Sequence, residues 1–367
     1  MAEDWCAIDF GTSNSAVALP GPAQDVVLVG LEDEQPTMPT AVFYRSDGPV
    51  HAAPACEYGR AALAAYVDGI EGRLMRSMKS ILGSDLLNQH TEIGAGRSVP
   101  YTDVVEGYLR RLKSRAEGHG GAPLRRAVIG RPVHFVDDDP VRDAQAQAAL
   151  EAAARRVGFE EVHFHYEPLA AALDHERTLA DDQLVLVADI GGGTSDFSLI
   201  RLGPQRRARL ARTEDILAHH GVHVAGTDFD RRLSLSALMP CLGYGSFGPA
   251  RAGRVPREVP SKVYFDLATW HLINTVYGPA RVAELRRMRS DYADLQLHTR
   301  LMTVLEHRLG HGLAAQAEHL KIAAASQGHA RADLSAVEPD LAVTIDEAAA
   351  GRAIEADCTR IEQAALE

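Results

Sequence analysis

The chain is 367 residues long, which is enough for two domains with substantial hydrophobic cores. Its 46% hydrophobic and 24% charged residues are typical of a soluble globular protein. The formal net charge of -12 argues against a general nucleic-acid binder or a protein that docks on anionic membranes, since both partners attract clustered Lys and Arg. No apolar run approaches the length of a bilayer span.

Four cysteines are scattered through the sequence without a Cys-x-x-Cys pair, so neither a disulfide framework nor a zinc site is indicated. The first residues, Met-Ala-Glu-Asp, are acidic, whereas a secretory signal begins with basic residues. Together these two features predict a protein of the reducing cytoplasm, where thiols remain unpaired.

The first structured segment is expected to be a hairpin. A short apolar run containing Asp9 leads into a turn of Gly11, Thr12 and Ser13, and a second apolar run ends at Leu19. This order of residue types is typical of a strand, a tight turn and a second strand. An acidic residue therefore stands beside a turn of small and hydroxyl residues.

Helical and strand patterns then alternate as far as residue 173. Strands are predicted over 127–133 and 162–166, and amphipathic or Ala-rich helices over 102–115, 143–157 and 167–173. The last helix begins with Glu-Pro, and Pro is tolerated in a first turn. This alternation predicts parallel strands joined by right-handed crossovers.

Residues 184–202 carry the clearest functional signal. An apolar run, which is expected to be a buried strand, reaches Asp189, breaks at three glycines and Thr194, and resumes as a second run that contains Asp196. Glycine lets the backbone approach a ligand closely, so that successive N–H groups can bind phosphate oxygens. A carboxylate beside such a cradle requires a cation, for which Mg²⁺ is the usual choice. The pattern predicts a Mg-nucleotide site, although an ordinary glycine hairpin would give the same local sequence.

Two other glycine loops do not fit this segment. A P-loop requires Gly-Lys-Ser/Thr and a following helix, and a dinucleotide-binding loop also opens a helix. The turn at 191–194 leads into a strand pattern instead.

The two hairpins share a pattern: Asp, an apolar residue, Gly, and then Thr-Ser. It occurs at Asp9 and again at Asp189, which indicates an internal duplication and two similar α/β lobes. Each lobe would present one hairpin to a ligand bound between them.

The rest of the chain is predicted to be mainly helical. A small-residue turn that includes Gly226 leads into a helix, and residues 266–326, with Glu318 and Lys321, are mostly helical. A pair of strands over 332–345 and a final helix complete the pattern.

These motifs resemble those of the superfamily of actins, sugar kinases and DnaK-type chaperone ATPases. Ile-Asp9-Phe-Gly-Thr-Ser is similar to its first phosphate motif, and Asp189-Ile-Gly-Gly-Gly-Thr-Ser-Asp to its second. Tyr166-Glu-Pro-Leu-Ala-Ala-Ala resembles the connecting segment of the chaperones, and Met-Lys79-Ser-Ile-Leu-Gly resembles their Lys-Arg-Leu-Ile-Gly. The chain looks most like the short YegD-like proteins, which lack a peptide-binding domain.

The resemblance implies an α/β fold of two actin-like lobes with duplicated ribonuclease H-like cores. The first lobe is expected over 1–177, with an inserted subdomain at about 36–101. The second is expected over 178–367, with a mostly helical insertion at about 229–310. The family's late Leu-Thr-Gly-Gly-Ser loop does not occur before residue 367, so the second lobe is expected to be incomplete.

The resemblance also implies roles for individual residues. Asp9, Glu167 and Asp189 would hold Mg²⁺ largely through water, and Lys79 would lie beside the γ-phosphate and the attacking water. Glu167, Asp189 and Thr194 join Lys79 as catalytic residues. The residues expected to contact ATP or ADP are Asp9, Gly11, Thr12, Ser13, Gly191, Gly192, Gly193, Thr194, Asp196, Gly226, Glu318 and Lys321.

Lysine usage supports two of these assignments. Only four of the 38 basic residues are Lys, so the composition uses Arg for general positive charge, and Lys79 and Lys321 both fall on motif positions. Lys is a compact point charge suited to a phosphate or a water. Glu318 and Lys321, three residues apart on a helix, could equally form a surface ion pair.

Three functions remain open from the sequence. The first is a chaperone-type ATPase that acts with protein clients or co-chaperones. The second is a small-molecule kinase, for which no carboxylate base can be assigned. The third is a nucleotide-poor structural or interaction module, which the absence of the late loop favours. Ile322 and Ala325 also stand where the chaperones' adenosine helix has an Arg and a Ser, so the stacking and hydroxyl contacts of those residues are not expected here.

Overall fold

The computed structural model describes residues 4–22, 25–47, 54–94, 96–207, 209, 212–250 and 255–367. The chain forms two compact units. Unit 1 contains Met1–Ala225 together with Arg360–Glu367, and unit 2 contains Gly226–Thr359.

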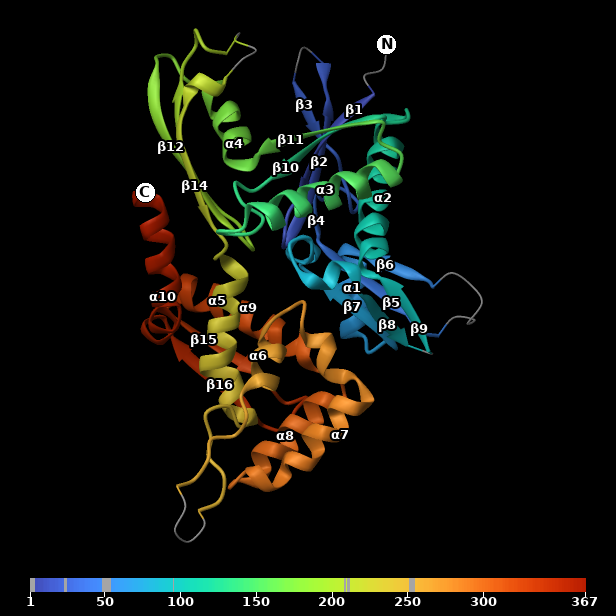
Figure 1. Ribbon diagram of the computed structural model, residues 1–367, viewed down its shortest axis with the longest axis vertical. Helices are drawn as coiled ribbons and strands as arrows, with labels where there is room; N and C mark the ends of the chain where they lie inside the picture. Colours follow the sequence, from blue (N-terminus) through green and yellow to red (C-terminus); the bar gives the residue numbers. More distant parts are fainter. Residues whose placement is uncertain are drawn as a thin grey trace. The chain divides into compact units, whose positions relative to one another are not determined.

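The centre of unit 1 is a mixed sheet of six strands (Figure 1). Its strands are β1 (Trp5–Phe10), β2 (Asn14–Pro20), β3 (Val26–Leu28), β4 (Thr37–Pro39), β10 (Arg126–Arg131) and β11 (Glu161–Tyr166). The order is β11–β10–β1–β2–β3, and β4 also pairs with β2. β1 and β10 are parallel, as are β10 and β11, whereas β1 and β2 form the antiparallel hairpin expected from the sequence.

Two long helices, α2 (Tyr101–Gly120) and α3 (Pro140–Arg156), pack on this sheet and on each other. α2 buries Val104, Tyr108 and Leu112, which recur every four residues and so lie on one helical face. It ends at Gly121, whose φ of +67° is a conformation that glycine adopts readily. α3 begins with Asp139 as its N-cap and Pro at its first position. Both helices occur where the sequence predicts them, and their apolar faces form one core with β1, β2 and β10.

Smaller elements lie between β4 and α2. Three strands, β5 (Ala41–Arg45), β6 (Cys56–Tyr58) and β7 (Gly72–Arg76), form a sheet with the order β6–β5–β7 that packs against α1 (Gly59–Val67). A hairpin follows, made of β8 (His90–Gly94) and β9 (Arg97–Pro100). Two 3₁₀ turns lie between β7 and this hairpin, and the first of them, over Met78–Ile81, carries Lys79.

A second sheet of unit 1 contains the glycine-rich hairpin. Its strands, in order, are β12 (Gln183–Ile190), β13 (Ser195–Leu202) and β14 (Ile216–Val222), all antiparallel. Helix α4 (Glu167–Glu176) packs against β12 and β13, where Leu169 and Ala172 contact Ile200 and Leu202.

The expectation that the whole apolar run of β12 is buried is wrong. Leu184, Leu186 and Ile190 are 60%, 56% and 53% exposed. They alternate with Val185 and Val187, which pack in the cluster beneath α4. Side chains alternate between the two faces of a strand, and α4 covers only one face of this edge strand.

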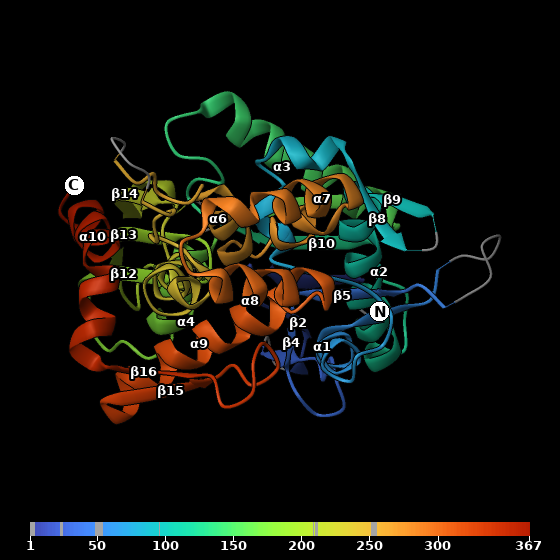
Figure 2. The same cartoon turned by 90° about the horizontal axis from the view of Figure 1, so that it is seen from below.

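Unit 2 is mostly helical, as predicted. Its helices are α5 (Gly226–Leu233), α6 (Lys262–Ala268), α7 (Pro279–Arg287), α8 (Leu295–Glu306), α9 (Gly310–Gln327) and the first part of α10 (Glu347–Leu366). The predicted strand pair is the hairpin of β15 (His329–Asp333) and β16 (Ala342–Asp346), which lies beside α9 (Figure 2). The core of unit 2 includes Leu238, Tyr264, Leu301 and Leu320, which are all fully buried.

The compact units do not follow the lobes expected from the duplication. The chain divides after Ala225 rather than after residue 177, because α4 joins the β12–β14 sheet to the rest of unit 1. The duplicated lobes stay a prediction. Within the two expected insertions, residues 48–53, 95 and 251–254 lie outside the described part of the chain. None of the described helices is long and apolar enough to cross a membrane.

Candidate functional site

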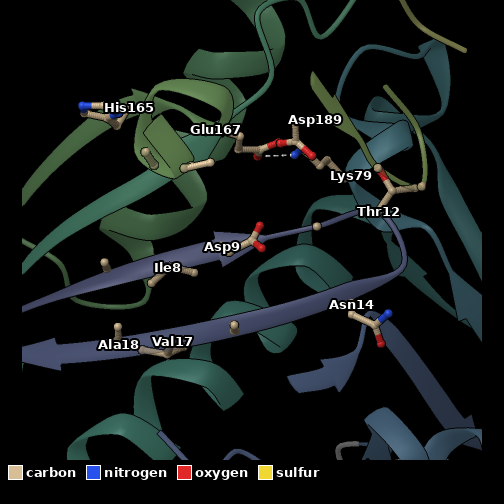
Figure 3. Close-up of a pocket in the computed structure, with 18 of the residues that line it drawn as sticks. Ile8, Asp9, Thr12, Asn14, Val17, Ala18, Lys79, His165, Glu167 and Asp189 are labelled. Carbon is tan, nitrogen blue, oxygen red and sulfur yellow. Dashed lines mark hydrogen bonds and ion pairs between the residues drawn. The ribbon is translucent and has the colours of Figure 1, made fainter. Parts of the chain in front are cut away.

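A cavity of about 690 Å³ lies within unit 1 and is formed by the β1–β2 hairpin, the end of β10, the start of α4 and the turn after β12. Figure 3 shows Asp9, Glu167 and Asp189 directed toward the same space, with Lys79 beside Glu167. Eleven residues singled out from the sequence line this cavity: Asp9, Gly11, Thr12, Ser13, Lys79, Glu167, Asp189, Gly191, Gly192, Gly193 and Thr194.

The two glycine turns are in direct contact inside the cavity. A Cβ atom added to Gly193 would lie 2.7 Å from Oγ1 of Thr12, and one added to Gly192 would overlap Oγ of Ser13. Neither glycine has a positive φ. Glycine is needed at these positions because the other turn approaches so closely, not because of an unusual backbone conformation.

Thr40, which the sequence analysis did not single out, binds the backbone of the first turn. The Thr40 backbone N–H donates to the Ser13 carbonyl at 2.9 Å, and the Thr40 hydroxyl donates to the Gly11 carbonyl at 2.8 Å. The Ser15 and Thr40 hydroxyls are also within hydrogen-bonding distance, at 2.9 Å. These bonds fix both carbonyls of the turn, so its N–H groups keep a defined direction.

Buried hydrogen bonds also anchor the second turn. One carboxylate oxygen of Asp196 accepts from the Val133 N–H at 2.7 Å, and the Ser195 hydroxyl donates to the Val224 carbonyl at 2.7 Å. Asp196 is 1% exposed and does not line the cavity. The geometry gives it a supporting position beneath the turn, whereas the sequence suggested ligand contact.

Burial raises the pKa of Asp196 to about 7, from a usual value of 3.8. In the unfolded chain this carboxyl ionises near 3.8, while in the folded chain it keeps its proton up to about 7. Its contribution to stability is therefore complete below about pH 4 and is lost as the pH rises through 7.

We expect Asp196→Asn to change stability in a pH-dependent way. Asn can accept the same bond from Val133 but cannot ionise. In metal-free protein the variant should match the parent at pH 4 and exceed its free energy of unfolding at pH 8 by on the order of 2–4 kcal/mol. Urea unfolding at both pH values measures this. Asp174→Asn, at a carboxyl that is 83% exposed, is the control. An equal difference at both pH values would contradict the assignment.

Lys79 and Glu167 form an ion pair at one side of the cavity, with 2.5 Å between Nζ and Oε1. Their side chains are only 7% and 17% exposed. The turn that carries Lys79 follows Ser77, which has a left-handed φ of +53°, a strained conformation for a residue with a side chain. A Cβ on Gly130 would lie 3.1 Å from Cγ of Glu167, so this glycine, which sequence reasoning missed, makes room for Glu167.

The acids of the cavity influence one another. Asp9 is exposed where it lines the cavity. The surrounding protein nonetheless removes water from its carboxyl, and this desolvation, reinforced by the negative charge of Glu167, raises the pKa of Asp9 to about 6. Burial and the charge of Glu167 also raise the pKa of Asp189, while Lys79 acts in the opposite direction on both. The cavity therefore gathers negative charge that a bound cation would stabilise.

Binding of Mg²⁺ largely through water stays a prediction for these carboxylates. Among the described residues, no three His, Cys, Asp or Glu side chains are close enough to hold one metal ion directly. Mg²⁺ retains several of its waters in proteins and is held by one or two carboxylates together with phosphate oxygens. Three carboxylates around a cavity of this size suit that mode of binding.

The remaining predicted residues lie in unit 2. Lys321 on α9 forms an ion pair with Asp230 on α5 at 2.8 Å and donates to the Gly226 carbonyl at 3.1 Å. Gly226 and Lys321 are thus neighbours within this unit. Glu318 lies one turn before Lys321 on the same helix and is half-buried.

Comparison with known proteins identifies similar chains. Residues 85–236 match the family model "Hsp70 protein". The chain is 31% identical over 245 residues to a protein described as "Chaperone protein HscA homolog" from Aromatoleum aromaticum, covering 62% of this chain and 36% of that one. A second such homologue, from Azoarcus sp., is 32% identical over 236 residues, with the same coverage.

A third relative is "Chaperone protein DnaK" from Thermosipho melanesiensis, which is 30% identical over 228 residues, covering 62% of this chain and 34% of the relative. The chain therefore spans about a third of the length of the curated relatives it matches. An Hsp70 domain implies an actin-like ATPase fold, which agrees with the mixed sheets and helices described above. The chain is thus similar, over residues 85–236, to the Hsp70 family model, and at about 30% identity to chaperone proteins described as HscA homologues and DnaK.

Proposed function

We propose that this protein binds Mg-ATP through the cavity of unit 1 and hydrolyses it with water as the phosphoryl acceptor. The observation that carries the proposal is the contact between the two glycine turns, where Thr12 meets Gly193 in a cavity that also contains three carboxylates and a buried lysine. Such a combination offers N–H groups and a positive charge to phosphates, and carboxylates to a hydrated cation.

Each part of the cavity has a task in this chemistry. The turns after Asp9 and Asp189 bind phosphate oxygens through backbone N–H groups and through the hydroxyls of Thr12 and Thr194. Asp9, Glu167 and Asp189 would hold a hydrated Mg²⁺, which would neutralise phosphate charge when bound. Lys79, oriented by Glu167, supplies a positive charge beside the attacking water. Phosphoryl transfer depends almost entirely on this kind of positioning and charge neutralisation.

The wider setting is proposed from the similar chains. The relatives are named as chaperones, and we propose that protein clients or co-chaperones are partners of this chain. We also propose that Gly226, Glu318 and Lys321 of unit 2 contact the nucleoside. None of the four cysteines forms a disulfide. We also propose the cytoplasmic setting that the sequence suggests.

Calorimetry with Mg-ATP, combined with a phosphate-release assay, tests this function. We expect measurable heat, a raised melting temperature and phosphate released to water, all abolished by a metal chelator. Thr194→Ala should lower the hydrolysis rate by about 10-fold or more while leaving the fold intact, because it removes one phosphate donor.

The alternatives predict other results. A lack of both heat and a melting shift would favour a structural module that binds no nucleotide. Transfer of phosphate to an added alcohol or sugar, with none released to water, would favour a small-molecule kinase. Unchanged turnover in Thr194→Ala would remove that residue from the site.

A further inference from the structure

The end of β10 contains an arginine that the proposed site does not use. Arg131 is adjacent to Tyr166 in the parallel β10–β11 pair, and its side chain is only 11% exposed. Its guanidinium carbon lies 5.1 Å from the ring centre of Phe135 and 5.3 Å from that of Tyr166. An arginine held between two rings in this way has little freedom to move.

Arg131 donates hydrogen bonds both to the loop over residues 132–135 and to α3, where Nη1 donates to Gln147. Nε donates to the Pro132 carbonyl at 2.9 Å, and Nη2 donates to the Val133 carbonyl at 3.0 Å and to the Asp143 carboxylate at 2.9 Å. The same carboxylate accepts from the Phe135 N–H at 2.6 Å. Arg131 and Asp143 together therefore bind three backbone groups of a loop that has no regular secondary structure.

One further group of this loop points toward the glycine-rich hairpin. The Val133 N–H donates to Asp196, the buried carboxyl at the start of β13. Gly221 on β14 closes the other side of this contact, since a Cβ there would lie 3.2 Å from Val133 and close to Asp196. The direction of the Val133 N–H depends on the neighbouring carbonyls, and Arg131 binds both of them.

Arg131 is also linked to Glu167 through the residue before it, Tyr166. Tyr166, which packs against the guanidinium, is the N-cap residue of α4, and Glu167 is the first residue of that helix. The residue before Arg131 is Gly130, which leaves room for the Glu167 side chain. The buried guanidinium of Arg131 thus contacts Tyr166, which precedes Glu167 of the Lys79–Glu167 pair. It also binds the 132–135 loop, which holds Asp196 beneath the second glycine turn.

We propose that Arg131 is a positioning residue, which fixes the 132–135 loop so that Val133 holds Asp196 and keeps the second glycine turn against the first. The inference rests on the function proposed above for its effect on hydrolysis, but its structural part can be tested without nucleotide. Small displacements of positioned groups typically cost on the order of 10²-fold in rate.

The test compares Arg131→Met with Arg131→Lys and with a matched control. Met keeps the apolar stem and loses every donor, whereas Lys keeps the charge but not the planar fork. The control is Arg212→Met. Arg212 belongs to the same unit and makes a bidentate pair with Glu176, at 2.9 Å for both bonds, at the far end of α4. It does not line the cavity.

Two measurements are made on each full-length variant. Hydrogen exchange in nucleotide-free protein should show the Val133 N–H exchanging about 10-fold faster in Arg131→Met than in the parent, with little change in the control. The value of kcat should fall by about 10-fold or more in Arg131→Met, less in Arg131→Lys, and by less than twofold in Arg212→Met.

The outcomes separate the two proposals. Unchanged Val133 exchange, or equal losses in Arg131→Met and Arg212→Met, would overturn the positioning role. If the parent protein hydrolyses no ATP while the exchange of Val133 still depends on Arg131, the proposed function fails and the positioning role stands. If Arg131→Met does not fold, the kcat and exchange of Arg131→Lys decide between the same outcomes.

Discussion

Lys79→Met should reduce ATP hydrolysis by on the order of 10²-fold or more while leaving Mg-ATP binding measurable. Lys79 is the one Lys or Arg side chain among the described residues that line the cavity, and it lies 2.5 Å from Glu167. Without it, three carboxylates would face the phosphates and the attacking water with no positive side chain among them. Single-turnover phosphate release and calorimetry measure the two effects separately.

The matched control for this substitution is Lys113→Met. Lys113 is also largely buried, at 12% exposure, and pairs with Glu117 four residues later on α2. It does not line the cavity, so it should lower stability modestly and leave hydrolysis within about twofold of the parent. Equal turnover in Lys79→Met and in the parent would remove Lys79 from the chemistry. Equal losses in both variants would indicate a general loss of folded protein.

The hairpins and most helices could be predicted from the sequence because their signals are local. A glycine run between two apolar runs specifies strand, turn and strand, and the four-residue recurrence in α2 specifies its buried face. The supports of the site were not predictable in this way. Thr40 contacts Gly11 across 29 positions and Val133 contacts Asp196 across 63, and no short pattern marks either contact.

The exposure of β12 shows a second limit of sequence reasoning. Leu184, Val185, Leu186 and Val187 are all apolar, so the run gives no alternation to distinguish a covered face from an open one. The position of α4 on one face of the sheet decides which side chains are buried. Which face of β12 is buried therefore depends on packing between elements, and the residue pattern of a single strand does not reveal it.

Gly192→Ala should separate the two glycine turns and therefore affect both stability and nucleotide binding. The added methyl group would overlap Oγ of Ser13 and lie 3.2 Å from its Cβ and 3.3 Å from its backbone nitrogen. Overpacking of this kind typically costs about 1–3 kcal/mol. We expect a loss of that size in the free energy of unfolding of nucleotide-free protein, together with a Kd for Mg-ATP raised about 10-fold or more.

The neighbouring glycine provides the control, and a second substitution provides the rescue. A Cβ at Gly191 would meet only the Thr194 carbonyl oxygen at 3.5 Å, an ordinary contact, so Gly191→Ala should leave the nucleotide-free protein as stable as the parent or slightly more stable. Ser13→Gly in the Gly192→Ala background removes the overlapping atoms and should restore most of the lost stability, which a double-mutant cycle measures. If Gly192→Ala unfolds like the parent, the turns are not in contact, and a cavity shared by the two hairpins loses its structural basis.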